Sequence, residues 1–510
     1  MATAARPNIL FIIADQHHAG CLGHAGHPQV QTPHLDRLAG EGVRFTRAVT
    51  NNPICTPSRM CYLSGQYVHN HGYFGLSGLP PVGLPTIFGH FRQAGYRTAA
   101  IGKLHCPDGW VEADCDVSLE AYADLSPTGH SAYADYLRAL GLEADRDDDL
   151  LPEQGPEAVY QTIEARPSRL PYRHSVEGWC VQEAERFITA AASSPWIMQV
   201  SLPRPHEIYA PAQEFWDLYA DETIWLPPNT DADLALKAPH LRAMRREYDN
   251  PAGMLFEPKT FDALRRRKQH GYLGCISQVD HAVGELLTLL EQRGLRDNTI
   301  VIYTSDHGDY ASEFGLLEKA PGICGSAVCR IPSIWRWPGH FAAGHASGQI
   351  METVDLAPTL CALSGIAPMP TADGGDLTRL LHGEEVPIHA IGVTEHAWSK
   401  SVLKDDWRLV YYPRGFFAGE DFGELYHLTD DPWEQHNRYF DPQYREKVLE
   451  LQRDLLDWLI TTTRIRTFLP PVLSPDGSNT QHEDFFHSYV DADGKVPWQG
   501  VARASSLNYK

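Results

Sequence analysis

Four short apolar runs stand out in the pattern of hydrophobic and polar positions along the chain. They lie at residues 8–14, 96–101, 196–202 and 299–304. Continuous runs of this length are typical of strands buried on both faces of a largely parallel sheet. Segments of helical period separate them, at residues 32–39, 85–94, 176–192, 261–293 and 354–363. We therefore predict an α/β fold in which helices flank a large mixed, mostly parallel sheet.

Turn residues and polarity define the other segments of this region. A short strand is expected at residues 43–49, and a helix that begins at Cys55 is expected to stop at Gly65. The long helix at 261–293 is expected to break near residues 271–274, where two glycines fall. The loops and irregular excursions are expected at residues 66–84, 107–170 and 207–260.

The pattern changes near His389, where shorter segments begin. Antiparallel strands are expected at residues 391–395, 401–404 and 407–412, with a helix at 442–461 packed on them. The segment 466–510 is rich in Pro, Gly and Asp but contains interleaved aromatics, namely Phe485, Phe486, Tyr489 and Trp498. A disordered tail is one interpretation, and an arm that wraps a neighbouring subunit is the one we favour. We expect a catalytic α/β domain (1–385), a small α+β subdomain (386–465) and an intersubunit arm (466–510).

Composition narrows the class of protein and its partners. The chain has 510 residues, 43% apolar residues, 21% charged residues and a formal charge of −22, which is ordinary for a globular protein except for its acidity. Nucleic acids and anionic membranes require a basic face, so we expect neither as a partner. The ten cysteines are scattered, the first residues lack a signal-peptide core, and no run reaches a membrane span. We therefore expect a cytoplasmic protein with reduced thiols, and a homodimer or dimer of dimers as the simplest assembly.

Ionisable residues follow each of the four buried strands. Asp15, Lys103 with His105, His206, and Asp306 with His307 come directly after the apolar runs. Ligands of open α/β sheets bind beyond the carboxyl ends of the strands, so these side chains are expected to meet at one place. A single histidine or aspartate after a strand is usually an ordinary loop or helix-capping residue. Four such coincidences at matched positions favour a functional site.

The segment Cys55-Thr56-Pro57-Ser58-Arg59 is expected to lie over the same place. Pro57 suits the first turn of a helix, so Cys55 is presented at the positive helix end, where backbone N–H groups favour an anion. Arg59 lies one turn further along and can reach back over the same spot. An isolated match of this kind can equally be a buried cysteine beside a helix-capping turn. The other candidate residues therefore decide whether this segment is interpreted as functional.

The residue types sort into a metal set and a cationic set. Oxygen donors from Asp15, Gln16 and Asp306 suit Ca²⁺ or Mg²⁺, and the imidazole of His307 shifts the preference toward Mn²⁺. The cationic set supplies hydrogen-bond donors and positive charge, and consists of Arg59, Lys103, His105, His206 and Lys319. A metal with fixed cations is what a tetrahedral oxyanion ester needs as charge builds on its oxygens.

The motif at residues 55–59 resembles the signature of the type I, formylglycine-dependent sulfatases of the alkaline phosphatase-like superfamily. The other matching motifs, in order, are Asp15-Gln16, Gly102-Lys103-Leu104-His105, Pro205-His206, Thr304-Ser305-Asp306-His307-Gly308, Lys319 and Glu424-Leu425-Tyr426-His427-Leu428-Thr429-Asp430-Asp431-Pro432. The resemblance implies an alkaline-phosphatase-like α/β sandwich with a smaller C-terminal α+β subdomain that contains an antiparallel sheet. It places the chain near the arylsulfatase and phosphonate monoester hydrolase branch.

The resemblance also implies the roles of the residues. A formylglycine-generating or equivalent maturation enzyme would convert Cys55 to an aldehyde, whose hydrate attacks sulfur and forms a covalent sulfated intermediate. His206 and Lys319 would support the leaving oxygen, His105 would take a proton when the intermediate collapses, Lys103 would bind sulfate oxygens and Arg59 would hold the nucleophile's environment. One divalent metal ion, Ca²⁺ or Mn²⁺, would be held by Asp15, Gln16, Cys55, Asp306 and His307.

Two departures from the family's pattern leave the substrate open. Many members have Asp where this chain has Gln16 and Asn where it has His307, and both changes bring the chain nearer the phosphonate branch. The pair Lys103 and His105 is typical of sulfatases instead. We expect hydrolysis of sulfate monoesters, with aryl sulfates as substrates. The alternatives are a promiscuous phosphonate monoester or phosphodiester hydrolase and a non-catalytic anion-binding protein with unconverted Cys55.

The aromatic residues Tyr67, Tyr73, Phe74 and Tyr209 could stack on an aryl group or anchor loops.

Overall fold

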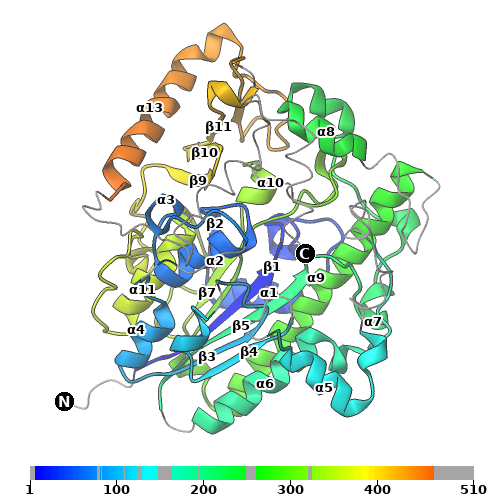
Figure 1. Ribbon diagram of the computed structural model, residues 1–510, viewed down its shortest axis with the longest axis vertical. Coiled ribbons are helices and arrows are strands. Elements are labelled where there is room, and N and C mark those ends of the chain that lie inside the picture. Colours follow the sequence, from blue (N-terminus) through cyan, green and yellow to red (C-terminus); the bar gives the residue numbers. More distant parts are fainter. Residues whose placement is uncertain are drawn as a thin grey trace, which may run out of the picture.

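Eight strands form the central sheet of the computed structural model (Figure 1), in the order β4-β3-β5-β1-β6-β7-β2-β8. The strands are β1 (Asn8–Asp15), β2 (Val43–Val49), β3 (Arg97–Gly102), β4 (Val117–Glu120), β5 (Trp196–Pro205), β6 (Thr299–Ser305), β7 (Ser333–Arg336) and β8 (His345–Glu352). The structure describes residues 6–464 except 77–80, 82, 108, 123–128, 147–163, 192–193, 248–259, 320–323 and 418. Among the described strands, β7 runs antiparallel to its neighbours β6 and β2, whereas the other pairings of this sheet are parallel. The large mixed, mostly parallel sheet expected from the sequence is confirmed.

Thirteen α-helices lie in the described part of the chain. They are α1 (Pro33–Glu41), α2 (Cys55–Ser64), α3 (Val68–His71), α4 (Ile87–Gln93), α5 (Ala132–Leu140), α6 (Val176–Ala191), α7 (Gln213–Trp216), α8 (Pro239–Glu247), α9 (Phe261–Gln292), α10 (Ser326–Cys329), α11 (Leu356–Leu363), α12 (Thr378–Leu381) and α13 (Arg445–Thr462). None of them combines the length and apolar character needed to cross a bilayer.

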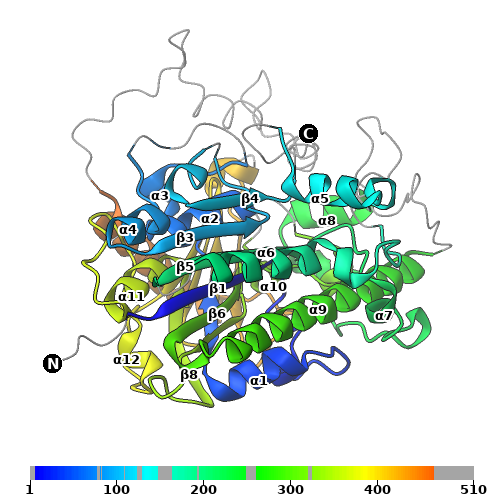
Figure 2. The same ribbon diagram turned by 90° about the horizontal axis from the view of Figure 1, so that it is seen from below.

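The two faces of β1 serve two hydrophobic cores, because side chains alternate along a strand. Leu10, Ile12 and Ala14 pack with residues of α1, α6 and α9. Ile9 and the other residues of the opposite face pack with α2, α4 and α11. Helices therefore cover both faces of the sheet (Figure 2), and the buried pattern of β1 reflects a strand with no solvent-facing side.

A second, four-stranded antiparallel sheet follows the central one, in the order β12-β11-β10-β9. Its strands are β9 (Gly392–His396), β10 (Ser399–Lys404), β11 (Trp407–Tyr411) and β12 (Gly423–His427). Val448, Leu451 and Leu455 of α13 pack on this sheet, at the top of Figure 1. The small α+β unit expected from the sequence is thereby confirmed as a fold, whereas its boundary at residue 386 stays a prediction. The proposed arm, 466–510, lies outside the described residues, and the homodimer stays a prediction with it.

Three expectations about elements are wrong. Residues 107–170 contain the edge strand β4 and the helix α5, although their polar sequence predicts irregular structure. Strands β7, β8 and β12 were not expected. The long helix α9 is continuous through Gly271 and Gly274. A side-chain carbon at Gly271 would lie 2.8 Å from the carbonyl oxygen of Tyr209, so this glycine allows a close contact and does not break the helix.

Candidate active site

The four strands that end in ionisable residues are neighbours in the sheet. They lie side by side in the order β3, β5, β1 and β6, all parallel, so their carboxyl ends share one edge. Gly102 ends β3 with a positive φ of 107°, which turns the chain just before Lys103. The expectation that these strand ends converge is confirmed.

Helix α2 begins at Cys55 and ends at Gly65, whose φ of 69° suits a glycine helix stop. The Cys55 sulfur lies 3.2 Å from Nε2 of His307 and 3.8 Å from Oδ1 of Asp15, and the residue is fully buried. Burial, together with the neighbouring charge of Asp15, raises the pKa of the Cys55 thiol to about 12. At neutral pH the unmodified side chain is therefore a thiol and a poor nucleophile.

Asp15, Cys55, Asp306 and His307 form the candidate metal centre. One ligand atom from each lies within 4.8 Å of all the others. Carboxylate oxygens and an imidazole nitrogen are donors that divalent cations accept, so the residues present fit the metal that the sequence predicts. Burial lowers the pKa of His307, which keeps its imidazole neutral and able to bind a metal.

Arg59 joins the two carboxylates behind this centre. Its guanidinium contacts Oδ2 of Asp15 at 3.0 Å and Oδ2 of Asp306 at 2.9 and 3.0 Å, and all three residues are fully buried. Lys103 donates to the same Asp15 oxygen, with its Nζ at 2.7 Å. The Oδ1 atoms of both carboxylates therefore face the Cys55 and His307 side, where a cation would be bound.

His105 lies at the same edge and is held through its backbone. The Glu120 carboxylate accepts hydrogen bonds from the backbone N–H of Leu104 at 2.9 Å and of His105 at 3.3 Å. Nδ1 of His105 is buried without a hydrogen-bond partner. Burial, with the nearby cations Lys103 and Arg59, lowers the pKa of His105 well below its usual value, so the ring is neutral and can accept a proton.

His206 and Lys319 form the other side of the site. Lys319 Nζ lies 3.1 Å from Nε2 of His206 and 2.7 Å from the side-chain oxygen of Gln16. Burial and the charges of Lys103 and Lys319 lower the pKa of His206 well below its usual value. The His206 ring is therefore neutral beside Lys319.

Gln16 bridges these two parts of the site. Its backbone N–H donates to Asp306 Oδ1 at 3.0 Å, and its side-chain nitrogen donates to Asp309 at 2.6 Å and to Glu207 at 3.2 Å. Its φ of 68° lies in the left-handed region, which an ordinary residue adopts only when its neighbours hold it there. The metal-ligand role of Gln16 stays a prediction, because its oxygen is placed against Lys319.

The four aromatic residues all pack against the protein's own cores, which favours the loop-anchoring alternative. Tyr67 is buried and its hydroxyl donates to Glu352 at 2.6 Å, and Tyr209 is fully buried beside Tyr272. Tyr73 is also buried in the core around α4. These three therefore anchor the fold, while Phe74 is partly buried against the core of the small sheet.

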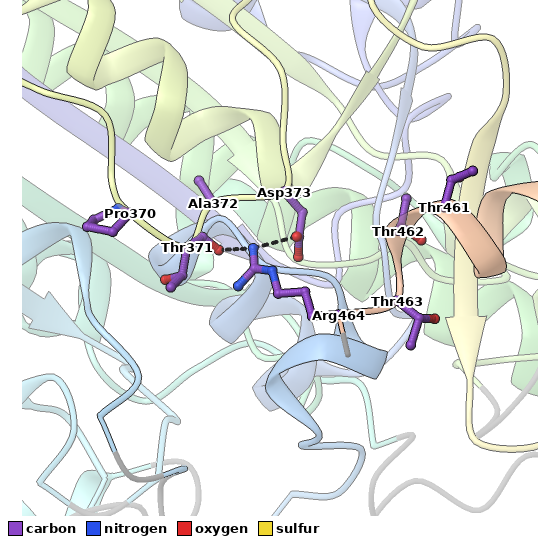
Figure 3. Close-up of a pocket in the computed structure, with 8 residues that line it drawn as sticks. All are labelled: Pro370, Thr371, Ala372, Asp373, Thr461, Thr462, Thr463 and Arg464. Carbon is purple, nitrogen blue, oxygen red and sulfur yellow. Dashed lines mark hydrogen bonds and ion pairs between the residues drawn. The ribbon is translucent and has the colours of Figure 1, made fainter. Parts of the chain in front are cut away.

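A cavity of about 550 Å³ lies at the end of α13 (Figure 3), between residues 370–373 and 461–464. Arg464 points into this region and contacts Asp373 and the carbonyl oxygen of Thr371. None of the candidate site residues lines this cavity. The candidate active site is therefore the ionisable cluster and does not include this cavity.

Four contributors to the site are absent from the sequence expectation. Glu120 ends strand β4, which was not predicted from the sequence. Lys268 lies on α9, far from the strand ends along the chain, and donates to Asp309 at 2.6 Å. Glu207 and Asp309 each follow a predicted site residue closely, after His206 and His307 respectively. The adjacency of these acids to site residues is the only signal in the sequence that points to them.

Comparison with known protein families yields two matches. The model described as "Sulfatase" matches residues 7–366, and the model described as "N-sulphoglucosamine sulphohydrolase, C-terminal" matches residues 313–460. Together these matches span both sheets.

Similar proteins agree with the families. An arylsulfatase of Clostridium perfringens is 28% identical over 475 residues, which cover 88% of this chain and 94% of that protein. A "multifunctional alkaline phosphatase superfamily protein PehA" of Trinickia caryophylli is 26% identical over 533 residues, 94% of this chain and 99% of that protein. The crystal structure of a phosphonate monoester hydrolase of Agrobacterium radiobacter superposes with a TM-score of 0.76 at 22% identity, over 92% of this chain and 99% of that one. The alkaline-phosphatase-like fold expected for the chain is confirmed.

Proposed function

Because the chain belongs to the sulfatase family, we propose that it hydrolyses aryl sulfate monoesters with a nucleophile made from Cys55. Family membership makes the protein a hydrolase of sulfuric esters. The aryl preference and the conversion of Cys55 to formylglycine are what the proposal adds. The similarity to an arylsulfatase and the C-T-P-S-R motif at residues 55–59 support both.

The residues that would hold one divalent ion, Ca²⁺ or Mn²⁺, are Asp15, Asp306, His307 and the side chain of residue 55, with Gln16 as the remaining candidate. The bound ion would supply positive charge next to the nucleophile's hydroxyl and the sulfate oxygens. Asp15 and Asp306 are suited to this role because Arg59 binds Oδ2 of each while both Oδ1 atoms lie toward His307, although Asp306 Oδ1 also accepts the backbone N–H groups of Gln16 and His307.

The nucleophile is one hydroxyl of the hydrated aldehyde at position 55. It would attack sulfur while its proton passes to the Asp306 carboxylate, an S–O bond would form, and the S–O bond to the phenol would break. Lys103, 2.7 Å from Asp15 and so at the edge of the centre, binds a sulfate oxygen. His105 then takes the proton of the second hydroxyl, the bond from carbon to the sulfated oxygen breaks, and sulfate leaves as the aldehyde forms again. Water adds to the aldehyde and completes the cycle.

The phenol leaves on the side of His206 and Lys319. Their Nζ–Nε2 distance is 3.1 Å, and the lowered pKa of His206 supports a neutral ring beside the lysine before the reaction. The pair therefore provides both a cation for the developing phenolate and a proton for its oxygen.

One observation supports the proposal above all: Cys55 lies at the start of α2 within 4.8 Å of two carboxylates and an imidazole. The test is mass spectrometry of the peptide that contains Cys55, from protein produced in its native host or with a maturation enzyme. The expected result is replacement of the CH₂SH group by an aldehyde. A thiol in every molecule would contradict the proposal and favour a non-catalytic anion-binding protein.

A phosphonate monoester or phosphodiester hydrolase is the second candidate. Gln16 and His307, together with the similarity to a multifunctional superfamily member, favour it. A panel of aryl sulfates, phosphonate monoesters and phosphodiesters, compared by kcat/KM on matured enzyme, separates the candidates. Lys103→Ala is expected to lose sulfatase activity most. Two results together would favour the phosphonate monoester or phosphodiester hydrolase: Lys103→Ala loses sulfatase activity but keeps phosphoesterase activity, and the wild type has a higher kcat/KM for phosphoesters than for sulfate esters.

A further inference from the structure

A buried ion pair lies behind the leaving-group side of the site. Lys268 of α9 donates to Oδ1 of Asp309 at 2.6 Å, and both side chains are fully buried. The ammonium of Lys268 also lies over the rings of Tyr209 and Tyr272, 4.7 and 4.3 Å from their centroids. Neither charged residue belongs to the metal set or to the cationic set described above.

The other oxygen of Asp309 determines how Gln16 is oriented. Oδ2 accepts a hydrogen bond from the side-chain nitrogen of Gln16 at 2.6 Å, and Glu207 accepts from the same nitrogen at 3.2 Å. A carboxylate can only accept hydrogen bonds, so the nitrogen of the amide, and not its oxygen, must face these two acids. The amide oxygen is therefore turned toward Lys319, whose Nζ lies 2.7 Å away.

We propose that the Lys268–Asp309 ion pair positions Lys319 for departure of the leaving group, by holding the Gln16 side chain with its oxygen toward that lysine. The inference rests on the proposed function only in its choice of substrate. Lys268, Asp309 and Gln16 are positioning residues, and Lys319 is the group that touches the ester. The chain of contacts runs from Lys268 through Asp309 and Gln16 to Lys319 and then to His206.

The burial of the pair supports a positioning role. Taking two charges out of water is costly, and such a pair contributes little net stability compared with apolar residues of similar size. The pair instead fixes which oxygen of Asp309 faces Gln16. Lys268 and the backbone N–H of Ala311 both donate to Oδ1, so Oδ2 remains to accept from Gln16.

Asp309→Asn tests the proposal. Asparagine keeps the shape, but its single oxygen is drawn to the Lys268 ammonium, so its NH₂ group faces the NH₂ group of Gln16. Gln16 then loses the shorter of its two acceptors, keeps only the 3.2 Å contact to Glu207, and is no longer held in one position against Lys319. Supporting contacts around a catalytic group typically contribute about 10–100-fold to activity. We expect a loss of kcat/KM of that size for esters of weakly acidic phenols and at most about threefold for 4-nitrophenyl esters, whose leaving group needs little assistance.

Asp280→Asn is the matched control. Asp280 lies on the same helix, is also buried, and accepts the backbone N–H groups of His34 and Leu35 at the start of α1, away from the strand ends that carry the site. It is expected to lower stability without changing the dependence on leaving group. A crystal structure of the Asp309 variant should show Lys319 Nζ displaced from Gln16.

The outcomes separate the inference from the proposed function. An equal loss for all leaving groups, or a leaving-group dependence that matches the Asp280 control, would overturn the inference. If Asp309→Asn does not fold, the double variant Lys268→Met with Asp309→Leu removes both the unbalanced charge and the acceptor of the Gln16 nitrogen, and must show the same leaving-group dependence. If the wild type prefers phosphonate monoesters, the proposed function fails, and the same comparison with aryl phosphonates still tests the role of the ion pair.

Discussion

Arg59 donates from Nε and Nη2 to one oxygen of Asp306, at 3.0 and 2.9 Å, and no part of either side chain reaches solvent. The same guanidinium bonds Asp15 and the backbone oxygen of Lys103. One cation on α2 therefore connects the ends of β1, β3 and β6. It neutralises two buried acids through their Oδ2 atoms, while both Oδ1 atoms face His307, which explains how the site can tolerate two adjacent carboxylates.

Arg59→Lys is expected to destabilise the protein strongly. Lysine has one ammonium group in place of the planar fork and cannot bond both carboxylates in the same geometry. Breaking a buried pair of this kind costs about 3–5 kcal/mol in the free energy of unfolding, measured by urea denaturation. Arg97→Lys, in an exposed pair with Asp116, is the control and should change the unfolding free energy by less than about 1 kcal/mol. A comparable loss in the two variants would contradict the role given to Arg59.

Removal of divalent ions by a chelator is expected to lower the melting temperature, and added Ca²⁺ or Mn²⁺ to restore it. A ligand at 100 times its Kd stabilises the folded state by about 2.7 kcal/mol. Asp15→Asn should abolish the dependence of Tm on metal concentration, because Oδ1 of Asp15 is one of the clustered donor atoms. Asp280→Asn should keep that dependence. A Tm that does not respond to any of the ions would rule out the metal centre.

Glu120→Gln is expected to lower kcat about tenfold, with a smaller effect on KM, because contacts around a catalytic group contribute on this scale. Burial raises the pKa of Glu120 to about 7, although the N–H groups of Leu104, Tyr122 and His105 oppose the shift. Glutamine has one acceptor oxygen, so it can accept either from Leu104 and His105 or from Tyr122, and the turn that carries His105 is held less firmly. Asp116→Asn, at the amino ends of β3 and β4 beside Arg97 and Thr98 and so away from the site, serves as the control. Full activity of Glu120→Gln would show that the turn needs no such support.

The stability of the protein is expected to fall at alkaline pH through His389. Burial alone would lower the pKa of His389, but Asp355 and Glu352 outweigh it and raise the pKa to about 9. The folded state therefore binds this proton more tightly than the unfolded state does. Its contribution is fully present below about pH 6.5, is lost as the pH rises through about 9, and is on the order of 3 kcal/mol at most.

Urea midpoints measured across this pH range check the prediction. His389→Gln should be less stable than the wild type below about pH 6.5 and should lack the alkaline loss that this histidine causes. His436→Gln, a change at a largely exposed ring, should retain it. Equal slopes in the wild type and His389→Gln would mean that the Asp355 contact contributes nothing to folding.

Much of the fold could be predicted because its information is local. The runs that became β1, β3, β5 and β6 are uninterrupted and apolar, and a strand buried on both faces needs nothing else to be recognised. Strands that are short or that mix polar and apolar residues could not be recognised in this way. β4 is partly exposed over most of its length, and β8 alternates irregularly, so their strand character comes from hydrogen bonds to partners that only the folded chain provides.

The amino-acid sequence by itself determined which residues end the four central strands and which cysteine begins α2. Their meeting follows from a general property of parallel sheets, that all carboxyl ends share one edge. The tertiary structure alone decided the partners of those residues. Lys319 reaches Gln16 across 303 positions of the chain and Gln16 reaches Asp309 across 293. Such contacts depend on the directions of side chains brought together by packing, and neither periodicity nor motif spacing encodes those directions.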